Sequence, residues 1–115
     1  MPAKGIHHVD LAVGDVDRSL AFCLALLGPV GWVEEIQYPT YRGTEAVVYL
    51  KEPATGAMFG LRAAYGGVHH YYDVGIEHLA FEVDSREEVD AAYERCVAHG
   101  AQIHFPPEGD RDVEG

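Results

Sequence analysis

An eight-residue segment that occurs twice, 70 positions apart, is the feature of this sequence that most restricts its fold. Residues 6–13 read IHHVDLAV and residues 76–83 read IEHLAFEV. Apolar and polar residues alternate in both copies, as in a β-strand with one buried face. The alternation places His8 and His78 at equivalent positions on the polar face. Such a repeat indicates one supersecondary unit that is used twice.

A helix is expected after each copy of the strand. Asp15 is the expected N-cap of the first helix, in which apolar residues recur at helical spacing until Gly28 ends it. Ser85 and Glu88 form a capping box for the second helix, which is expected to end at Gly100. The same order of strand and capped helix in both copies supports the repeat.

Further strands are expected after the first helix, at residues 31–39, 45–51 and 57–64. They complete a βαβββ unit. The second copy has only one further expected strand, at residues 101–105, before a polar segment that is typical of turn and loop.

These elements predict the domain organisation. We expect a single α+β domain over residues 1–115, with a first module at about residues 5–64, a linker at residues 65–75 and a partial second module at residues 76–115. A complete second module would need about two more strands.

The composition excludes two classes of partner. The chain has 19 acidic and 8 basic residues, for a net charge of −11, whereas nucleic acids and anionic membranes are bound through clustered Lys and Arg.

No stretch approaches the roughly 20 apolar residues that span a bilayer, and we predict a cytoplasmic protein. Because there is no CxxC pair, Cys23 and Cys96 are interpreted as small buried hydrophobic residues.

The two strand copies and the first helix resemble the vicinal oxygen chelate superfamily, which includes glyoxalase I, fosfomycin-resistance thiol transferases, extradiol dioxygenases and bleomycin-resistance proteins. The resemblance is carried by residues 8–13 with Asp15 and the helix up to Gly28, and by residues 75–83, within residues 5–105. It implies paired βαβββ modules that form a curled mixed sheet with a central cleft, completed in a homodimer. In that cleft a divalent metal is chelated by adjacent oxygens of a small-molecule substrate.

The resemblance also implies metal ligands, which the family takes from the first and last strands of each module. On that pattern His8 and His78 are expected to bind Mn²⁺, Fe²⁺, Zn²⁺ or Ni²⁺. Gly60 stands where glyoxalase I-like members carry Glu, which favours the arrangement of two His and one Glu found in the fosfomycin-resistance and dioxygenase branches. That Glu is expected beyond Gly115. The alternatives are structural histidines in a hydrogen-bonded strand and a cleft whose metal site has decayed.

Other polar residues are candidates for the cleft or for its support. His69 and His70 are interpreted either as an acid/base pair or as part of an ordered aromatic loop. Asp10 and Glu82 either orient a ligand or form a pocket wall. The further candidates to line the cleft are Glu45, Tyr49, Arg62 and His104, and the residues expected in structural, core or interface roles are His7, His99, Trp32 and Tyr38.

The leading interpretation is a metal-dependent enzyme of the vicinal oxygen chelate type, acting on a small molecule with adjacent oxygens. Lyase or isomerase, thiol transferase and ring-cleaving dioxygenase reactions remain open. The alternative is a non-catalytic protein that sequesters a small molecule, similar to the bleomycin-resistance proteins, for which an acidic cleft would suit a cationic ligand. A third possibility is a fragment or pseudo-enzyme whose exposed sheet edge pairs with another chain.

Overall fold

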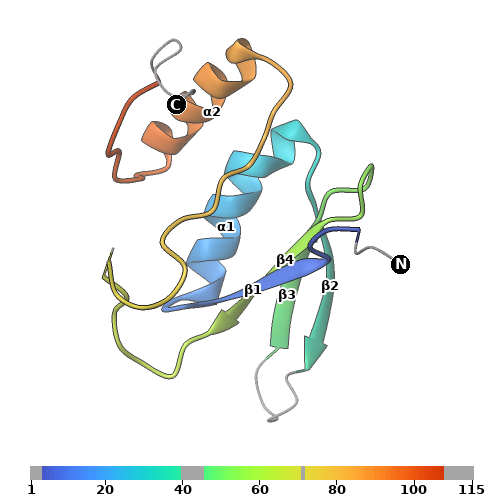
Figure 1. Cartoon of the computed structure of the whole chain (residues 1–115), viewed down its shortest axis with the longest axis vertical. Coiled ribbons are helices and arrows are strands. Elements are labelled where there is room, and N and C mark those ends of the chain that lie inside the picture. The colour runs from blue at the N-terminus through green and yellow to red at the C-terminus, as the bar shows by residue number, and fades with distance from the viewer. Residues whose placement is uncertain (1–3, 40–45, 71, 108–115) are drawn as a thin grey trace. The chain divides into compact units, whose positions relative to one another are not determined.

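The computed structural model describes residues 4–39, 46–70 and 72–107 (Figure 1). The chain divides into two units, residues 1–80 and residues 81–115. The first contains a sheet and a helix, and the second contains a helix.

The first unit is built on a four-stranded mixed sheet. Its elements in chain order are β1 (His8–Val13), α1 (Val16–Leu27), the 3₁₀ turn η1 (Gly28–Val30), β2 (Val33–Pro39), β3 (Ala46–Lys51) and β4 (Met58–Ala63). The strand order is β1-β4-β3-β2, with β1 parallel to β4 and the other neighbouring pairs antiparallel. The expected βαβββ unit is therefore formed, and each strand begins one or two residues inside its expected range.

Helix α1 begins as expected and is followed by an unexpected turn. Asp15 Oδ1 accepts a hydrogen bond from the Arg18 backbone N–H at 3.1 Å and so satisfies a free donor of the first turn. The helix ends at Leu27, but Gly28 has a right-handed φ of −55° and begins η1. Gly31, with a φ of +107°, is the residue that uses the left-handed freedom of glycine to end this segment.

The core lies between α1 and one face of the sheet (Figure 1). Leu27 of α1 packs with Leu50 of β3 and with Phe59 and Leu61 of β4, and Leu50 is fully buried at 0% exposure. Trp32 packs against this cluster, with its ring centroid 5.5 Å from that of Phe59. The expectation of a core role for Trp32 is confirmed.

The cysteines form no disulfide with each other. Cys23 and Cys96 are both free and partly buried. Cys23 packs against the core cluster, and its burial raises the pKa of the thiol. Its surroundings are those of a small hydrophobic residue rather than of a nucleophile.

The second unit contains helix α2 (Arg86–Ala98). Ser85 Oγ accepts a hydrogen bond from the Glu88 N–H at 3.2 Å, and Glu88 Oε1 accepts one from the Asp84 N–H at 2.9 Å. The expected capping interaction is therefore present, and Gly100, with a φ of +82°, follows the helix in the left-handed conformation. Among the described residues, no helix is long and apolar enough to cross a membrane.

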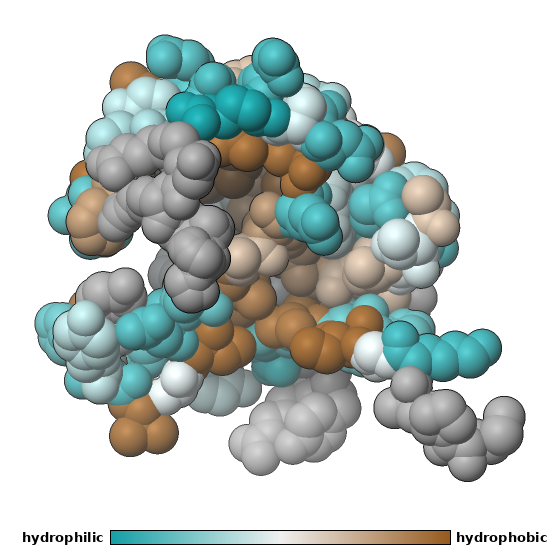
Figure 2. All heavy atoms as spheres, turned by 45° about the horizontal axis from the view of Figure 1, so that its top comes forward, coloured by the Kyte–Doolittle hydropathy of each residue, from teal (hydrophilic) through white to brown (hydrophobic). Residues whose placement is uncertain are grey.

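Two expected strands are not formed. Residues 76–83 and 101–105 are not part of any strand, because a strand requires a neighbour that supplies ladder hydrogen bonds and the described sheet consists of β1 to β4 alone. Without such a neighbour the apolar side chains of the second copy stay in contact with solvent: Ile76 is 52% and Leu79 is 41% exposed. Exposed apolar residues appear as brown areas among the teal of polar residues in Figure 2.

Candidate functional site

The candidate site lies on the sheet face that points away from α1. His8 and Asp10 are exposed on β1 while the residues between them are partly buried, as the alternation predicts. The strand register places Asp10 beside Gly60 of β4, and Gly60 beside Tyr49 of β3. His8 lies in the neighbouring row, beside Met58. Side chains from three strands therefore meet on this face.

The backbone at Gly60 is closely covered by side chains of this face. A Cβ atom at this position would lie 2.7 Å from Tyr49 Cε1, 2.8 Å from Asp10 Oδ1 and 2.8 Å from Val47 Cγ1. These distances are well below the roughly 3.5–4.0 Å of an ordinary carbon contact. The ring of Tyr49, which is only 9% exposed, takes the space that a side chain would need. A glutamate ligand at this position would have to displace that ring.

The His8 imidazole has two aromatic neighbours. Its Nδ1 is 2.9 Å from His7 Nδ1, and its ring meets that of Tyr49 edge to face, with centroids 5.8 Å apart and an interplanar angle of 83°. This contact fits two arrangements: His7 Nδ1–H donates to His8, or His8 Nδ1–H donates to His7 and His8 Nε2 carries the free lone pair. The second arrangement leaves Nε2 of His8 able to bind a metal.

The His78 imidazole is held by a carboxylate. Its Nδ1 lies 2.8 Å from Glu77 Oε1. Because a carboxylate only accepts hydrogen bonds, Nδ1 carries the proton and Nε2 of the neutral ring carries the lone pair. Histidines that bind metals commonly donate their other ring N–H to such a partner. The His78 side chain is 69% exposed and therefore accessible.

The two candidate ligands thus share one arrangement, in which the preceding residue engages Nδ1. Neutral imidazoles with a free Nε2 fit a divalent transition metal. Across residues 4–39, 46–70 and 72–107, however, no three His, Cys, Asp or Glu side chains gather into a group that could hold a metal ion. His8 and His78 are two potential ligands rather than a complete site.

A cleft of about 730 Å³ opens beside β1, where residues of that strand and of the segment after β4 line it. Asp10 and Asp73 contribute carboxylates and His69 an imidazole, while Val74 and Ile76 belong to a largely apolar wall. No Lys or Arg is among the described residues that line the cleft. Its wall therefore combines negative charge with apolar surface.

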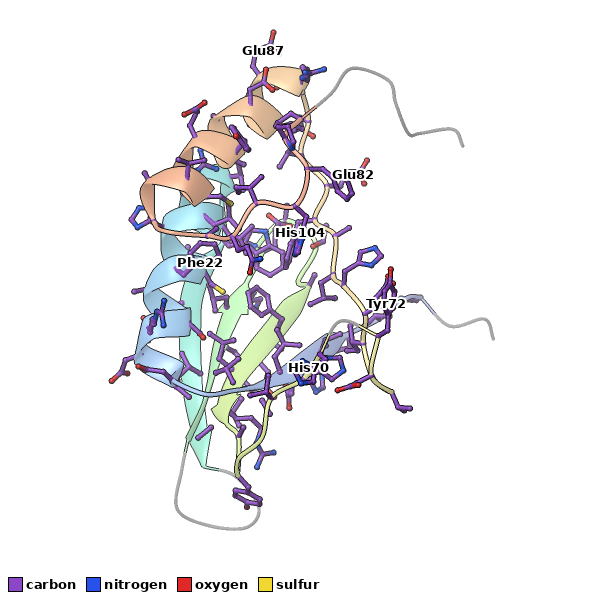
Figure 3. All side chains as sticks on the ribbon, turned by 90° about the vertical axis from the view of Figure 1, so that its left-hand side faces the viewer. Phe22, His70, Tyr72, Glu82, Glu87 and His104 are labelled. Atoms are coloured by element: carbon purple, nitrogen blue, oxygen red, sulfur yellow. The ribbon has the colours of Figure 1, made fainter. Side chains whose placement is uncertain are left out.

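His69 and His70, in the segment after β4, have different surroundings. The His69 ring lies against the backbone of Gly75, where a Cβ would be 2.7 Å from His69 Nε2. His70 belongs to a turn: its N–H donates to Asp73 Oδ2 at 3.1 Å, and its carbonyl accepts from the Asp73 N–H at 3.0 Å. Figure 3 shows the side chains of His70 and Tyr72 on this segment, and Tyr72 is 83% exposed. These contacts are typical of an ordered loop.

The other sequence candidates lie in several places. Arg62 is two residues beyond Gly60 on β4 and pairs with Ala12, so it shares the face of the site. The candidates that belong to the second unit are Glu82, His99 and His104. The candidates that fall outside the described positions are Glu45 and the side chain of Tyr38.

Three contacts of the candidate ligands are not among the expectations from the sequence. His7 was expected to have only a structural role, and Glu77 was given no role, yet each contacts the histidine that follows it. Their equivalent positions in the repeat were a usable signal. The contact between His8 and Tyr49 joins two strands that are not neighbours, and no local pattern indicates it.

The fold is similar to that of the genomically encoded fosfomycin resistance protein FosX from Listeria monocytogenes. Its monoclinic form at pH 5.75 matches with a TM-score of 0.69 and 22% identity, over 94% of this chain and 78% of that chain. Its complex with Mn(II) and sulfate ion matches with a TM-score of 0.65 and 22% identity, over 88% and 75% of the two chains. At this identity the likeness is one of fold.

Sequence comparison gives a relative and a family. The uncharacterized protein YqjT of Bacillus subtilis (strain 168) is 30% identical over 106 residues, which are 87% of this chain and 75% of that protein. Residues 5–112 match a known family along almost the whole chain, which confirms the resemblance inferred from the repeat. This chain belongs to the Glyoxalase/Bleomycin resistance protein/Dioxygenase superfamily.

Proposed function

We propose that this chain is a metal-dependent enzyme of the vicinal oxygen chelate type, acting on a small molecule with adjacent oxygen atoms. The observation that carries the proposal is the shared arrangement of His8 and His78, in each of which the preceding residue contacts Nδ1. A structural role does not require this arrangement at equivalent positions in both copies of the repeat. Membership of the superfamily supports the same kind of function.

The residues have distinct roles in this proposal. His8 and His78 bind a divalent metal through Nε2, and His7 and Glu77 hold the tautomers that leave Nε2 free. The third ligand, expected to be a glutamate, is not among the described residues. When bound, the metal supplies Lewis acidity, which polarises substrate oxygens. The proposal covers lyase or isomerase, thiol transferase and ring-cleaving dioxygenase reactions.

The metal content of the protein tests the proposal. Protein purified without chelator is analysed for Mn, Fe, Zn and Ni and then titrated calorimetrically with Mn(II), the ion present in Listeria FosX complexes. We expect stoichiometric binding by the wild type and its loss in His8→Ala and in His78→Ala. His99→Ala, at the C-terminal end of α2, serves as the matched control and should bind normally. A wild type that binds none of these metals refutes the proposal of a metal-dependent enzyme. Binding retained in both His8→Ala and His78→Ala refutes the assignment of the two ligands.

The contact between Glu77 and His78 allows a finer test. Loss of a residue that orients a metal-binding histidine typically weakens metal affinity about 10–100-fold. We expect Glu77→Ala to weaken Mn(II) binding by at least about tenfold. Glu87→Ala removes a carboxylate from the first turn of α2 and is the control for the change in net charge. Equal affinities in both variants would show that the carboxylate does not support the ligand.

We also propose that residues 76–115 form part of a second module and that the protein is a cytoplasmic homodimer. Light scattering coupled to gel filtration measures the assembly directly. A mass of two chains of 12.6 kDa is expected, and a single-chain mass at all concentrations contradicts it.

A second candidate function is sequestration of an organic cation, favoured by the cleft beside β1. Asp10 and Asp73 line this cleft, and none of its described lining residues is a Lys or Arg. Metal-free protein should then bind a hydrophobic cation such as tetraphenylphosphonium, more weakly in Asp10→Asn and equally well in His78→Ala. Absence of binding to metal-free protein excludes this function.

A further inference from the structure

We infer that Tyr49 is a positioning residue for the His8 imidazole and that Gly60 is glycine because the Tyr49 ring must cross it. The inference rests on the proposed function in one respect, namely that His8 is a metal ligand. The contact between the two rings is a separate observation.

The distance between the strands makes the contact unusual. His8 is on β1 and Tyr49 is on β3, and β4 lies between them. Two strand spacings amount to about 9–10 Å. The ring centroids are nevertheless 5.8 Å apart. The two side chains therefore lean toward each other across β4.

Gly60 is the residue over which they lean. The register aligns it with Tyr49, and a Cβ atom there would lie 2.7 Å from Tyr49 Cε1. Any larger residue would push the ring away from the sheet and open the contact with His8. The absence of a side chain at this position thus allows an interaction between two other strands.

The contact restricts the His8 ring from a second direction. His7 engages Nδ1, and the edge-to-face contact with Tyr49 sets the plane of the imidazole. Tyr49 is itself only 9% exposed, so its ring is a fixed support. Together the two neighbours define the direction in which Nε2 is presented.

The test compares Tyr49→Leu, which removes the ring, with Tyr49→Phe, which keeps it. Tyr65→Leu, at a tyrosine that is 78% exposed, is the matched control. One readout is NMR of the metal-free protein: nuclear Overhauser effects between the His8 and Tyr49 rings, and the ring-current displacement of the His8 C–H signals. The other is Mn(II) affinity by calorimetry.

We expect the Overhauser contacts in the wild type, and the ring-current displacement in the wild type, Tyr49→Phe and Tyr65→Leu but not in Tyr49→Leu. Mn(II) binding should be about tenfold weaker in Tyr49→Leu and normal in the other two variants. Absence of the ring contacts in the wild type, or His8 signals unchanged in Tyr49→Leu, overturns the inference whether or not metal binds. Ring contacts in a wild type that binds no metal would instead refute the proposed function and leave the positioning of the imidazole standing.

Discussion

A single methyl group added at Gly60 is expected to destabilise the first unit, although the backbone there accepts alanine. Gly60 lies within β4 and is not among the glycines with positive φ. Within a strand, replacing glycine by alanine stabilises by about 0.5–1 kcal/mol when the space is free. Here the new methyl group would meet three side chains at 2.7–2.8 Å.

The steric term is expected to exceed the gain in backbone entropy. Overpacking of a filled site costs about 1–3 kcal/mol, so at the middle of both ranges the net loss for Gly60→Ala is roughly 1 kcal/mol. For a unit of this size each kcal/mol lowers Tm by roughly 4–8 °C. Because Tyr49 Cε1 is the nearest atom, the loss should be smaller when Tyr49→Leu is already present.

Urea and thermal unfolding of Gly60→Ala, Tyr49→Leu and the double variant measure the loss of stability in each background. Gly14→Ala is the control, since Gly14 does not have positive φ and nothing lies within 4 Å of its added Cβ. Its free energy of unfolding should stay within about 0.5 kcal/mol of the wild type. A Gly60→Ala variant as stable as the wild type, or one destabilised equally in both backgrounds, refutes the steric reasoning.

Other predictions concern the core, a turn and a thiol. Leu50→Ala should reduce the free energy of unfolding by about 2–5 kcal/mol. Val33 is 45% exposed, so Val33→Ala should reduce it by about 0.5 kcal/mol or less, and urea titration measures both changes. Hydrogen bonds from the Thr55 backbone and side chain and from a neighbouring backbone N–H lower the pKa of Glu52. The stability difference between the wild type and Glu52→Ala should therefore be full above the ordinary carboxyl pKa and should disappear as the pH falls through the lowered value, which unfolding at a series of pH values detects. Because burial raises the pKa of Cys23, iodoacetamide should alkylate it more slowly than free cysteine at neutral pH, with the difference lost in denaturant; equal rates in the native protein contradict this.

Both helices and the strands of the first unit could be predicted from the sequence because their signals are local. Asp15 and Ser85 cap their helices through bonds to residues three positions away, as their spacing indicates. The alternation in β1 correctly separates the exposed face from the buried one. The second copy of the same pattern formed no strand, because alternation describes what a strand would bury and does not supply the neighbour that it must pair with.

The site was less predictable because its contacts are set by the order of strands. Sequence patterns select His8 and His78 as equivalent residues. They do not reveal that Tyr49 reaches His8 across an intervening strand, since that depends on the register of three strands at Gly60. The effect of the missing side chain at Gly60 on this contact can be seen only from the positions of the surrounding atoms.

The parallel pairing of β1 with β4 also has a consequence for how the site forms. It joins His8 to Met58, residues 50 positions apart in the chain, whereas β3 and β4 meet through a short turn. Pairings of large sequence separation are entropically the hardest to close and tend to slow folding. The hairpin of β3 and β4 can therefore form early and bring Tyr49 next to Gly60 while β1 is still free. His8 joins them only when the long loop closes, so the appearance of its contact with Tyr49 marks the pairing of β1 with the sheet. A nascent chain that ends before β4 has no site at all.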